Sequence, residues 1–418
     1  MLFALLLAAL LLRAGVLWKY SDRLGVDRDN YRGIARELAA GKGFTDPRTQ
    51  SPTAYRPPLY PILLAAVLYC GGHDFAIAAV QLALSLGTVA LTIASGRRLG
   101  LGRASLAAGG LAAVDPLLVF QSALVMTETT AAFLAALLLW ACMGSPSQRR
   151  SLGIGIIFGL CCLCRPTFWA FGALAGGVWV LTRLRGRGSA ESLAPNRWKH
   201  AAILAAGLVL IVAPWAIRNA LVLGRPIVTT THGGYTLLLA HNPAYTHAVV
   251  DRAWNGVWKG DEFEQWAASL ESEMAREIPA AGAPHSGPAV EVVRDDWMNR
   301  KAWKYIRTEP ATAVKAGITL LLRMWSLSPR AVGEAPISTA TRIAIGVFNV
   351  VVLLSMLAGV VRLSRSNGRQ WWPPVALILA FTAVHALYWA DMRMRTPLVP
   401  AIALLAAAGW RPVVRLSR

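Results

Sequence analysis

Charge is scarce in this sequence. Only 15% of its 418 residues are charged, and 22 acidic residues stand against 42 basic ones. A chain with so little charge and 55% hydrophobic residues has more apolar surface than one water-soluble core can bury, and it is too hydrophobic to remain disordered. A membrane protein is therefore expected. In such a protein the formal net charge of +20 is explained by basic loops beside the cytoplasmic leaflet, so a nucleic-acid partner is not expected.

Cysteine and nucleotide-binding motifs are also sparse. The five cysteines lie in apolar runs, and the C-x-x-C formed by Cys161 and Cys164 has no second pair to complete a zinc site. They are interpreted as small residues that pack helices. The chain has neither a Walker sequence nor a G-x-G-x-x-G loop, so a nucleotide-linked substrate is disfavoured.

Long apolar runs dominate what is present. A spanning helix needs about 20 mostly apolar residues, and the sequence predicts about ten such helices. The runs are 1–18, 75–95, 104–142, 152–182, 201–217, 343–361, 371–389 and 397–410, of which 104–142 and 152–182 are long enough for two helices each. The predicted fold class is an all-α polytopic membrane protein.

Basic residues are unevenly divided between the loops. The loops placed inside carry 16 Lys and Arg residues, whereas the short outer turns carry 3. The positive-inside rule then predicts an inner (plasma) membrane protein with both termini in the cytoplasm. The long loops face outwards and divide the chain into a membrane module 1–217 with a first outer loop 19–74, an outer subdomain 218–338, and C-terminal membrane helices 339–418. The first outer loop is an exception to the rule, since 19–56 holds 8 basic residues.

Amphipathic helices are predicted in both outer loops. The first helix lies between Asp27 and Gly41, with Tyr31, Ile34, Ala35 and Leu38 on one apolar face. Asp27 stands where an N-cap is expected, and the helix after Arg56 is about 14 residues long, too short to span. In the second loop, 262–277 and 295–306 are predicted helices with a flexible connector 279–288, and Trp297, Trp303 and Trp325 suggest helices at the headgroup level.

Glu128 is the acidic residue that stands out in the membrane module. A carboxylate inside an apolar run is costly and usually marks a functional site. The alternative is a structural ion pair with an arginine such as Arg165. Asp115, which precedes Pro116, is interpreted as a turn or cap residue.

A series of short motifs at predicted helix ends resembles one enzyme family. The motifs are Asp27-x-x-x-Tyr31, Gly41-x-Gly43, Arg56-Pro57-Pro58-Leu59-Tyr60-Pro61, Thr127-Glu128, Arg165-Pro166, Pro214-Trp215-x-x-Arg218-Asn219, Gly233-Gly234-Tyr235, Asn242-Pro243 and Arg393-x-Arg395-x-Pro397. Their order over nearly the whole chain resembles the GT-C-fold glycosyltransferases that use lipid-phosphate sugars. These include the protein O-mannosyltransferases and the aminoarabinose transferase of lipid A.

The resemblance implies a reaction and a set of site residues. The enzyme would transfer a sugar from a polyprenyl-phosphate donor to an acceptor hydroxyl at the outer face, with inversion. The acceptor could be a protein, a lipid or a polysaccharide. By position Asp27 matches the family's general base, Glu128 would be a second catalytic residue, and Asp29 is expected to point elsewhere on the helix. The residues expected to bind substrate are Tyr31, Arg56, Tyr60, Arg218, His241, Arg393 and Arg395, the four arginines as phosphate clamps unless they only reach toward lipid headgroups.

Two questions stay open at this point. The aminoarabinose transferase has an acidic residue before its basic-Pro-Pro motif that can help to bind a cation, whereas this chain has Tyr55 there. A divalent cation is therefore possible but no cofactor is assigned. The alternative function is a secondary transporter or lipid flippase, because intramembrane acids and Pro-broken helices also build transport paths. A non-catalytic scaffold would leave Asp27 and Glu128 without a role.

Overall fold

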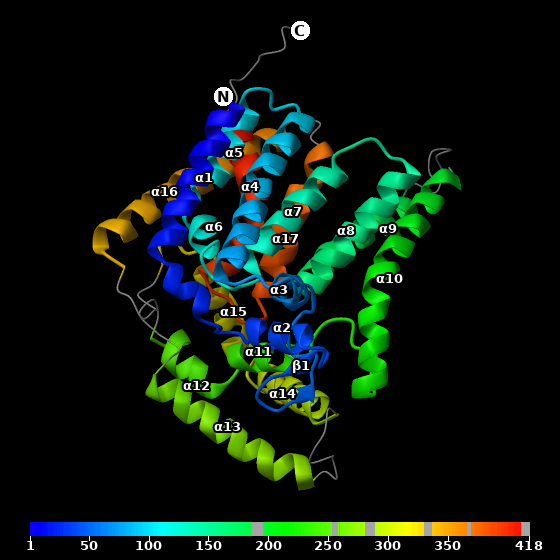
Figure 1. Cartoon of the computed structure of the whole chain (residues 1–418), viewed down its shortest axis with the longest axis vertical. Coiled ribbons are helices and arrows are strands. Elements are labelled where there is room, and N and C mark those ends of the chain that lie inside the picture. Colours follow the sequence, from blue (N-terminus) through cyan, green and yellow to red (C-terminus); the bar gives the residue numbers. More distant parts are fainter. Residues whose placement is uncertain are drawn as a thin grey trace.

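The structure is a computed structural model that describes residues 1–185, 195–252, 258, 260–280, 289–329, 337–365 and 369–410. Within these residues the fold is helical except for one antiparallel hairpin, β1 (Thr45–Asp46) with β2 (Ser51–Pro52). Most of the predicted connector 279–288 and the basic residues of the last inner segment lie outside the described residues. In Figure 1 the apolar helices fill the upper part of the molecule, and the outer-loop helices lie below them.

The apolar helices confirm an all-α polytopic membrane protein. Four are long and apolar enough to cross a membrane: α1 (Leu2–Lys19), α4 (Asp74–Arg98), α10 (Pro195–Leu223) and α16 (Thr339–Ser364). Beside them stand α3 (Leu59–Tyr69), α5 (Ala104–Val114), α6 (Pro116–Gln121), α7 (Glu128–Cys142), α8 (Gln148–Cys164), α9 (Phe168–Arg185), α17 (Trp372–His385) and α18 (Val399–Gly409). The predicted total of about ten spans stays a prediction, since many of these helices are shorter than about 20 residues.

Two helix breaks fall where the sequence places them, one at Asp115 and the other between α8 and α9 at Arg165-Pro166. Asp115 separates α5 from α6, and its Oδ1 accepts a hydrogen bond from Leu118 N at 2.9 Å, which confirms it as a cap. The preceding helix end is capped by Arg13 of α1, whose fully buried guanidinium donates to the carbonyl oxygens of Ala112 (3.0 Å) and Ala113 (2.6 Å). This explains why one arginine is tolerated in an apolar span.

Small residues let the membrane helices approach closely. A Cβ on Gly155 of α8 would overlap the carbonyl oxygen of Leu204 on α10, and one on Gly207 would lie 2.6 Å from the carbonyl oxygen of Leu152. The pair α16 and α18 meets in the same way at Gly359 and Gly409. Because lipid removes the hydrophobic driving force between helices, such close backbone packing is a main source of their association.

The outer layer is built from the two long loops. The first contributes η1 (Ser21–Gly25), α2 (Tyr31–Ala39) and the hairpin; the second contributes α11 (Gly233–Ala240), α12 (Pro243–Tyr245), η3 (Thr246–Val250), α13 (Asp261–Ala280), α14 (Ala289–Thr308) and α15 (Pro310–Met324). Two 3₁₀ turns, η5 (Arg369–Trp371) and η6 (Met392–Leu398), complete the fold. The predicted helices at 262–277 and 295–306 are confirmed as parts of α13 and α14, and Gly41 follows α2 with a φ of 76° as predicted.

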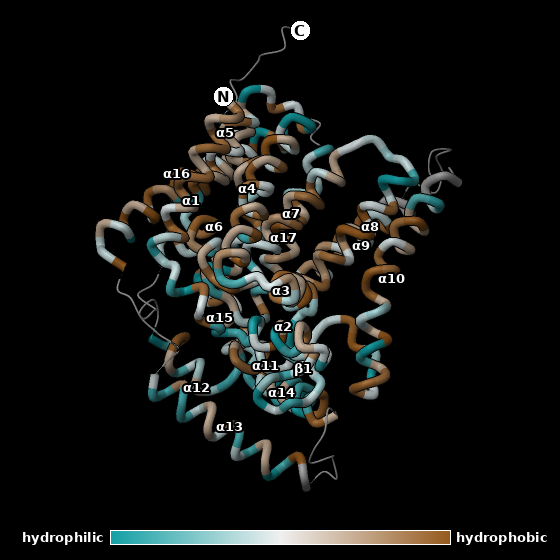
Figure 2. The backbone as a smooth tube through the Cα atoms, in the orientation of Figure 1, coloured by the Kyte–Doolittle hydropathy of each residue, from teal (hydrophilic) through white to brown (hydrophobic). Residues whose placement is uncertain are grey.

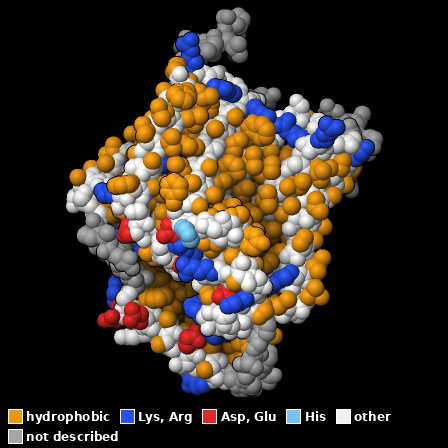
Figure 3. All heavy atoms as spheres, in the orientation of Figure 1, with side chains coloured by type: hydrophobic (Ala, Val, Ile, Leu, Met, Phe, Trp, Pro, Cys, Tyr) orange, Lys and Arg blue, Asp and Glu red, His pale blue; other side chains and the backbone are white. Residues whose placement is uncertain are grey.

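Hydropathy divides the molecule along its long axis. The helices of the upper part are mostly hydrophobic, whereas α13 and α14 are largely hydrophilic (Figure 2). On the face drawn in Figure 3, acidic side chains occur only in the lower half, and a row of basic side chains runs along the upper edge. The boundary between the apolar helices and the polar outer layer is therefore the expected place of the functional residues.

Candidate active site

The turn before α2 sends two neighbouring carboxylates in different directions. Both oxygens of Asp27 accept backbone hydrogen bonds from the first turn of α2, Oδ1 from Arg32 N at 3.1 Å and Oδ2 from Gly33 N at 2.7 Å. The predicted capping role of Asp27 is thus confirmed. Asn30 then takes a left-handed conformation with a φ of 62°, which an asparagine tolerates. Because α2 begins only at Tyr31, Asp29 lies on this turn and not on the helix.

Asp29 contacts the arginine of the basic-Pro-Pro motif. Arg56 Nη2 donates to Asp29 Oδ1 at 2.9 Å, and Arg56 Nε donates to the Asp29 carbonyl oxygen at 2.8 Å. The guanidinium also lies over the rings of Tyr31 (5.4 Å) and Tyr55 (5.0 Å). Asp29 therefore points elsewhere than Asp27, as expected, but it does so from the turn before α2 and toward Arg56, because the helix starts later than the sequence predicts.

Arg393 joins this pair to the membrane helices. Its Nη1 lies 3.9 Å from Asp29 Oδ2, and its Nε lies 3.9 Å from Glu128 Oε1 and 3.4 Å from Asp391 Oδ2. Glu128 in turn forms an ion pair with Arg165 Nη1 at 3.3 Å, so the predicted alternative of an Arg165 partner is confirmed. We call Asp29, Arg56, Glu128, Arg165, Asp391 and Arg393 the charge cluster.

The charge cluster is incompletely hydrogen-bonded. Glu128 is 1% exposed, and its Oε2 is buried without a hydrogen-bond partner among the described residues. The same holds for Arg165 Nη1, Arg393 Nε and the hydroxyl of Tyr60. Arg165 Nη1 and Arg393 Nε still make ion pairs, whereas Glu128 Oε2 and the Tyr60 hydroxyl make neither contact. Buried polar groups normally have a partner, so these two positions indicate that the cluster receives a polar ligand or water.

Electrostatics favour a permanently cationic Arg393. Burial alone would lower the pKa of Arg393, but the carboxylates of Asp391, Glu128 and Asp29 raise it above its ordinary value. Formally the cluster holds three guanidinium groups and three carboxylates. A group with a negative charge, such as a phosphate, could therefore displace carboxylate contacts while keeping every guanidinium paired.

Aromatic side chains stand next to the charge cluster. The rings of Tyr31 and Tyr60 meet edge to face at 5.4 Å, and burial raises the pKa of Tyr31 to about 12. The His232 ring lies 4.3 Å from that of Tyr55 and 5.3 Å from that of Tyr235. Burial, followed by the charges of Arg56 and Arg393, lowers the pKa of His232, so its imidazole is neutral at pH 7. The neutral ring can stack or accept a hydrogen bond but adds no charge.

Three predicted substrate residues have other roles in the structure. Arg218 Nη1 donates to the Thr53 carbonyl oxygen and Nη2 to that of Phe44, both at 2.7 Å, so its guanidinium supports the first outer loop. Arg395 is 2% exposed and donates to Asn349 Oδ1 at 2.9 Å. His241 Nε2 lies 2.8 Å from the Leu387 carbonyl oxygen. No described contact links any of the three to the charge cluster.

Sequence reasoning missed several parts of this arrangement. Glu291, in the first turn of α14, accepts from Ala54 N at 2.8 Å and from Thr53 Oγ1 at 2.5 Å, and so holds the segment that leads to Arg56. Asp391 and His232 also went unnoticed, because an Asp or His in an outer loop is unremarkable until its spatial neighbours are known. The one available signal for Asp391 was its position two residues before Arg393.

The residues present suit an anion better than a metal ion. Among the described residues no group of three His, Cys, Asp or Glu side chains gathers in a way that could hold a metal. Each carboxylate of the charge cluster also has a guanidinium beside it, and a guanidinium would repel a divalent cation. The cluster is thus organised around arginines.

Comparison with known proteins identifies the fold. No family model matches the chain, and no curated protein matches its sequence. Among solved structures it is similar to the oligosaccharyltransferase AglB from Archaeoglobus fulgidus in complex with an inhibitory peptide and a dolichol-phosphate, at 15% identity and a TM-score of 0.53, over 98% of this chain and 50% of that one. A second structure of the A. fulgidus enzyme, tethered to an acceptor peptide, gives 14% identity and a TM-score of 0.52, over 98% of this chain and 49% of that one. ArnT from Cupriavidus metallidurans bound to undecaprenyl phosphate aligns at 16% identity and a TM-score of 0.43, over 97% of this chain and 77% of that one.

The likeness to the two oligosaccharyltransferase structures shows the fold, and at the level of the fold it agrees with the expected resemblance to GT-C glycosyltransferases. The chain spans about half the length of the oligosaccharyltransferase that it matches. At this identity the activity does not follow from the likeness, so it has to be argued from the residues of the site.

Proposed function

We propose that this protein is a membrane glycosyltransferase that moves a sugar from a polyprenyl-phosphate donor to an acceptor at the outer face of an inner membrane. The observation that carries the proposal is the charge cluster. Three arginines and three carboxylates gather from the first outer loop, the start of α7, the end of α8 and η6, with open polar positions in a buried setting. The fold adds support, since it is shared with an enzyme solved with dolichol-phosphate.

The reaction requires a base and a cationic site. The acceptor oxygen forms a bond to the anomeric carbon, the bond from that carbon to the phosphate oxygen breaks, and the acceptor proton passes to a carboxylate. Polyprenyl phosphate leaves with one more negative charge than the donor phosphodiester had. Preorganised cations stabilise that developing charge, and they act more strongly in a site shielded from water.

The arginines of the charge cluster are the proposed phosphate ligands. Arg56 and Arg393 lie on either side of Asp29, and Arg165 lies beyond Glu128. The planar fork of a guanidinium matches two phosphate oxygens. Arg218 and Arg395 take a supporting role in this proposal, because carbonyl or amide oxygens already occupy their donors. Glu128 would orient Arg165 and Arg393 in the site.

The base is proposed to be a carboxylate of the turn before α2. Asp27 is the assignment that the resemblance implies, and two backbone N–H donors fix the position of its carboxylate. Asp29 is the alternative, since it touches the charge cluster directly. If Asp27 is the base, the role of Asp29 is to position Arg56 and Arg393. The sugar and the acceptor, whether a protein hydroxyl, a lipid or a polysaccharide, are left open by both assignments.

Binding of the product lipid tests the phosphate site. The purified full chain should bind polyprenyl phosphate much more tightly than polyprenol, since only the phosphate can meet the arginines. Arg393→Gln should weaken polyprenyl phosphate binding by about thirtyfold or more, the effect of truncating one partner of a buried charge pair. Arg48→Gln is the control, because it removes one arginine from the first outer loop, where the Arg48 side chain is 74% exposed. Equal affinity for the two lipids, or no effect of Arg393→Gln in a folded protein, would contradict the proposal.

A further inference from the structure

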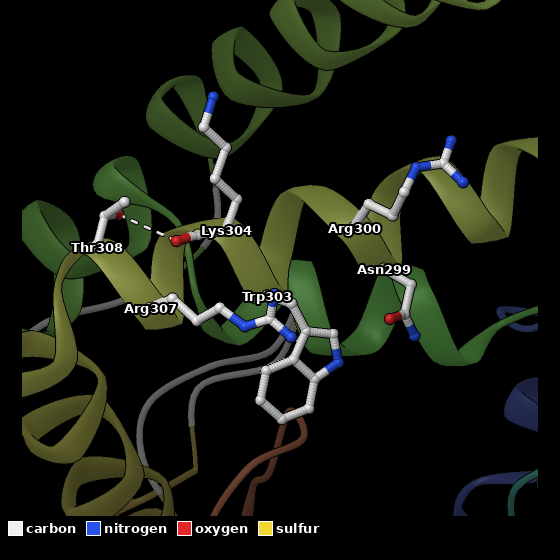
Figure 4. A pocket seen from close by; sticks show the side chains of 6 residues that line it. All are labelled: Asn299, Arg300, Trp303, Lys304, Arg307 and Thr308. Atoms are coloured by element: carbon white, nitrogen blue, oxygen red, sulfur yellow. Dashed lines mark hydrogen bonds between the residues drawn. The ribbon is translucent and has the colours of Figure 1, made fainter.

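The C-terminal half of α14 carries an unpaired basic stripe. Arg300, Trp303, Lys304 and Arg307 follow one another at spacings of three and four residues, which makes them neighbours on successive turns of the helix (Figure 4). All four are exposed, Trp303 to 37%. Among the described residues none of the three cations has an acidic partner. We call these four residues the basic stripe.

Four basic residues elsewhere in the outer subdomain do have acidic partners. Arg225 pairs with Asp296 at 2.5 Å and Arg252 with Glu262 at 2.7 Å, while Arg294 pairs with Glu271 and Lys301 with Glu273. Glu273 and Glu277 line a second hollow together with Arg300 and Lys304, yet none of the described acids forms an ion pair with the basic stripe. Such a surface attracts an anion that the chain itself does not provide.

A hollow accompanies the basic stripe. It measures about 520 Å³ and is lined by the four stripe residues together with Asn299 and Thr308. In Figure 4 the side chains of Trp303 and Arg307 extend to the side of α14 on which the chain continues into α15, and those of Arg300 and Lys304 extend to the other. No residue of the charge cluster lines this hollow.

The helix that follows has an exposed apolar side. Val314, Ile318 and Leu322 of α15 are 63%, 54% and 43% exposed, and they recur at every fourth residue. The opposite side of α15 is packed, with Ala316 and Leu320 buried. In a polytopic membrane protein an exposed apolar helix side faces acyl chains. Arg307 is in the last turn of α14, and Val314 follows it in the chain in α15, beyond the break at Glu309.

We propose that the basic stripe and the exposed side of α15 form a binding site for an anionic phospholipid. Arg300, Lys304 and Arg307 hold the headgroup phosphate, Trp303 lies at the level of the headgroups, and the apolar side of α15 meets the acyl chains. This order of groups along one continuous surface matches the order within a phospholipid. The bound lipid fixes the outer subdomain on the membrane surface. This inference does not depend on the glycosyltransferase proposal.

The site is tested by native mass spectrometry of the full chain in detergent. The measurement compares how much phosphatidylglycerol and how much phosphatidylcholine the protein retains. The triple variant Arg300→Gln/Lys304→Gln/Arg307→Gln should weaken phosphatidylglycerol binding about tenfold or more, because each cation near an anionic lipid adds to the attraction. The control Arg252→Gln/Arg276→Gln/Arg294→Gln removes the same charge from the same subdomain and should leave binding unchanged. If the triple variant fails to fold, Arg307→Gln alone should weaken binding about threefold or more.

Three results would overturn the inference. The stripe variants could bind phosphatidylglycerol as tightly as the wild type. Polyprenyl phosphate could displace phosphatidylglycerol from the wild type and lose its own binding in the stripe variant, which would assign the stripe to the donor. A soluble acidic oligosaccharide, with polygalacturonate as the probe, could bind through the stripe while phosphatidylglycerol does not, which would assign it to an acceptor.

Discussion

Asp27 and Asp29 differ in environment although only one residue separates them. The left-handed Asn30 turns the chain after them, so that Asp27 meets the backbone of α2 while Asp29 meets Arg56. The capping carboxylate contributes to local stability, and the ion-paired one places a guanidinium. To decide which of the two aspartates is the base therefore requires variants whose effects on protein stability and on turnover are measured separately.

Substitution of each aspartate by asparagine makes this separation. Asp27→Asn should lower sugar transfer by about 10² to 10⁴, the usual contribution of a general base, and cost about 1 kcal/mol or less of stability, since one oxygen can still cap. Asp29→Asn should lower transfer by only about tenfold, because Arg56 would be misplaced. A tenfold loss corresponds to about 1.4 kcal/mol of free energy. Transfer rates and thermal unfolding of both variants provide the measurement. A larger loss for Asp29→Asn than for Asp27→Asn would move the base to Asp29.

The sequence allowed part of the site to be predicted. Glu128 and its Arg165 partner could be found because a carboxylate in an apolar run needs a cation. Arg393 could be found from its motif. Asp391 and His232 could not. Asp391 gains its importance only because its neighbour Arg393 meets Asp29 and Glu128, and His232 because it meets Tyr55, and these partners lie more than 100 residues away in the chain. Arg395 and His241 resembled ligands because nothing in the sequence reveals which carbonyl oxygen a side chain will meet.

Helix contacts in the membrane part depend on glycines at specific positions. Gly155 and Gly153 lie on the same helix, α8, but only Gly155 faces the backbone of α10. A Cβ on Gly153 has no heavy atom within 4 Å. These two positions thus provide a matched pair, because both are glycines of the same helix and only their packing against α10 differs.

Alanine at each position should give opposite results. Gly155→Ala should destabilise the protein by about 1 to 3 kcal/mol, because α10 has to move away from α8. Gly153→Ala should be neutral or stabilise it by about 0.5 to 1 kcal/mol, since alanine restricts the unfolded chain. Thermal unfolding in one detergent compares them. Similar shifts in both variants would show that the close approach of α8 and α10 is not important for stability.

The helices themselves were predictable where composition alone decides them. The breaks at Asp115-Pro116 and Arg165-Pro166 correspond to helix bounds. The apolar runs fall on helices, but 104–142 forms α5, α6 and α7 where two helices were expected. α11 and α15 were not predicted as helices, and neither was the β1–β2 hairpin, since short elements are stabilised by tertiary contacts more than by their own sequence. The basic stripe also needed the structure, because its isolation from acids is a spatial property.

Across the whole molecule, charge and hydropathy vary along one axis. The 16 basic residues of the predicted inner loops oppose 3 in the short outer turns, and the subdomain 218–338 lies on the predicted outer side. The charge cluster would then open to the outer face, where polyprenyl-linked donors would have to be presented. The orientation of the chain in the membrane is therefore a premise of the proposed function.

The native cysteines make the orientation testable. Cys70, just after α3, is exposed, whereas Cys161, Cys162 and Cys164 are buried. A membrane-impermeant maleimide should label wild-type protein from outside, and Cys70→Ala should abolish that labelling. In the Cys70→Ala background, Gln148→Cys at the start of α8 should react only after permeabilisation. Reaction of positions 70 and 148 from the same side would reject the predicted topology and the outward-facing site.

Conversion of the donor by the purified protein tests the central claim most directly. The full chain is reconstituted with polyprenyl-phosphate-linked sugars extracted from membranes, and the release of free polyprenyl phosphate is followed together with the new sugar linkage. The proposal predicts cleavage by the wild type and a loss of about 10² to 10³ in Arg56→Ala, the effect of removing one group that stabilises the leaving charge. Movement of intact donor between the two leaflets without any cleavage, in wild type and variant alike, would contradict the account and favour a lipid flippase.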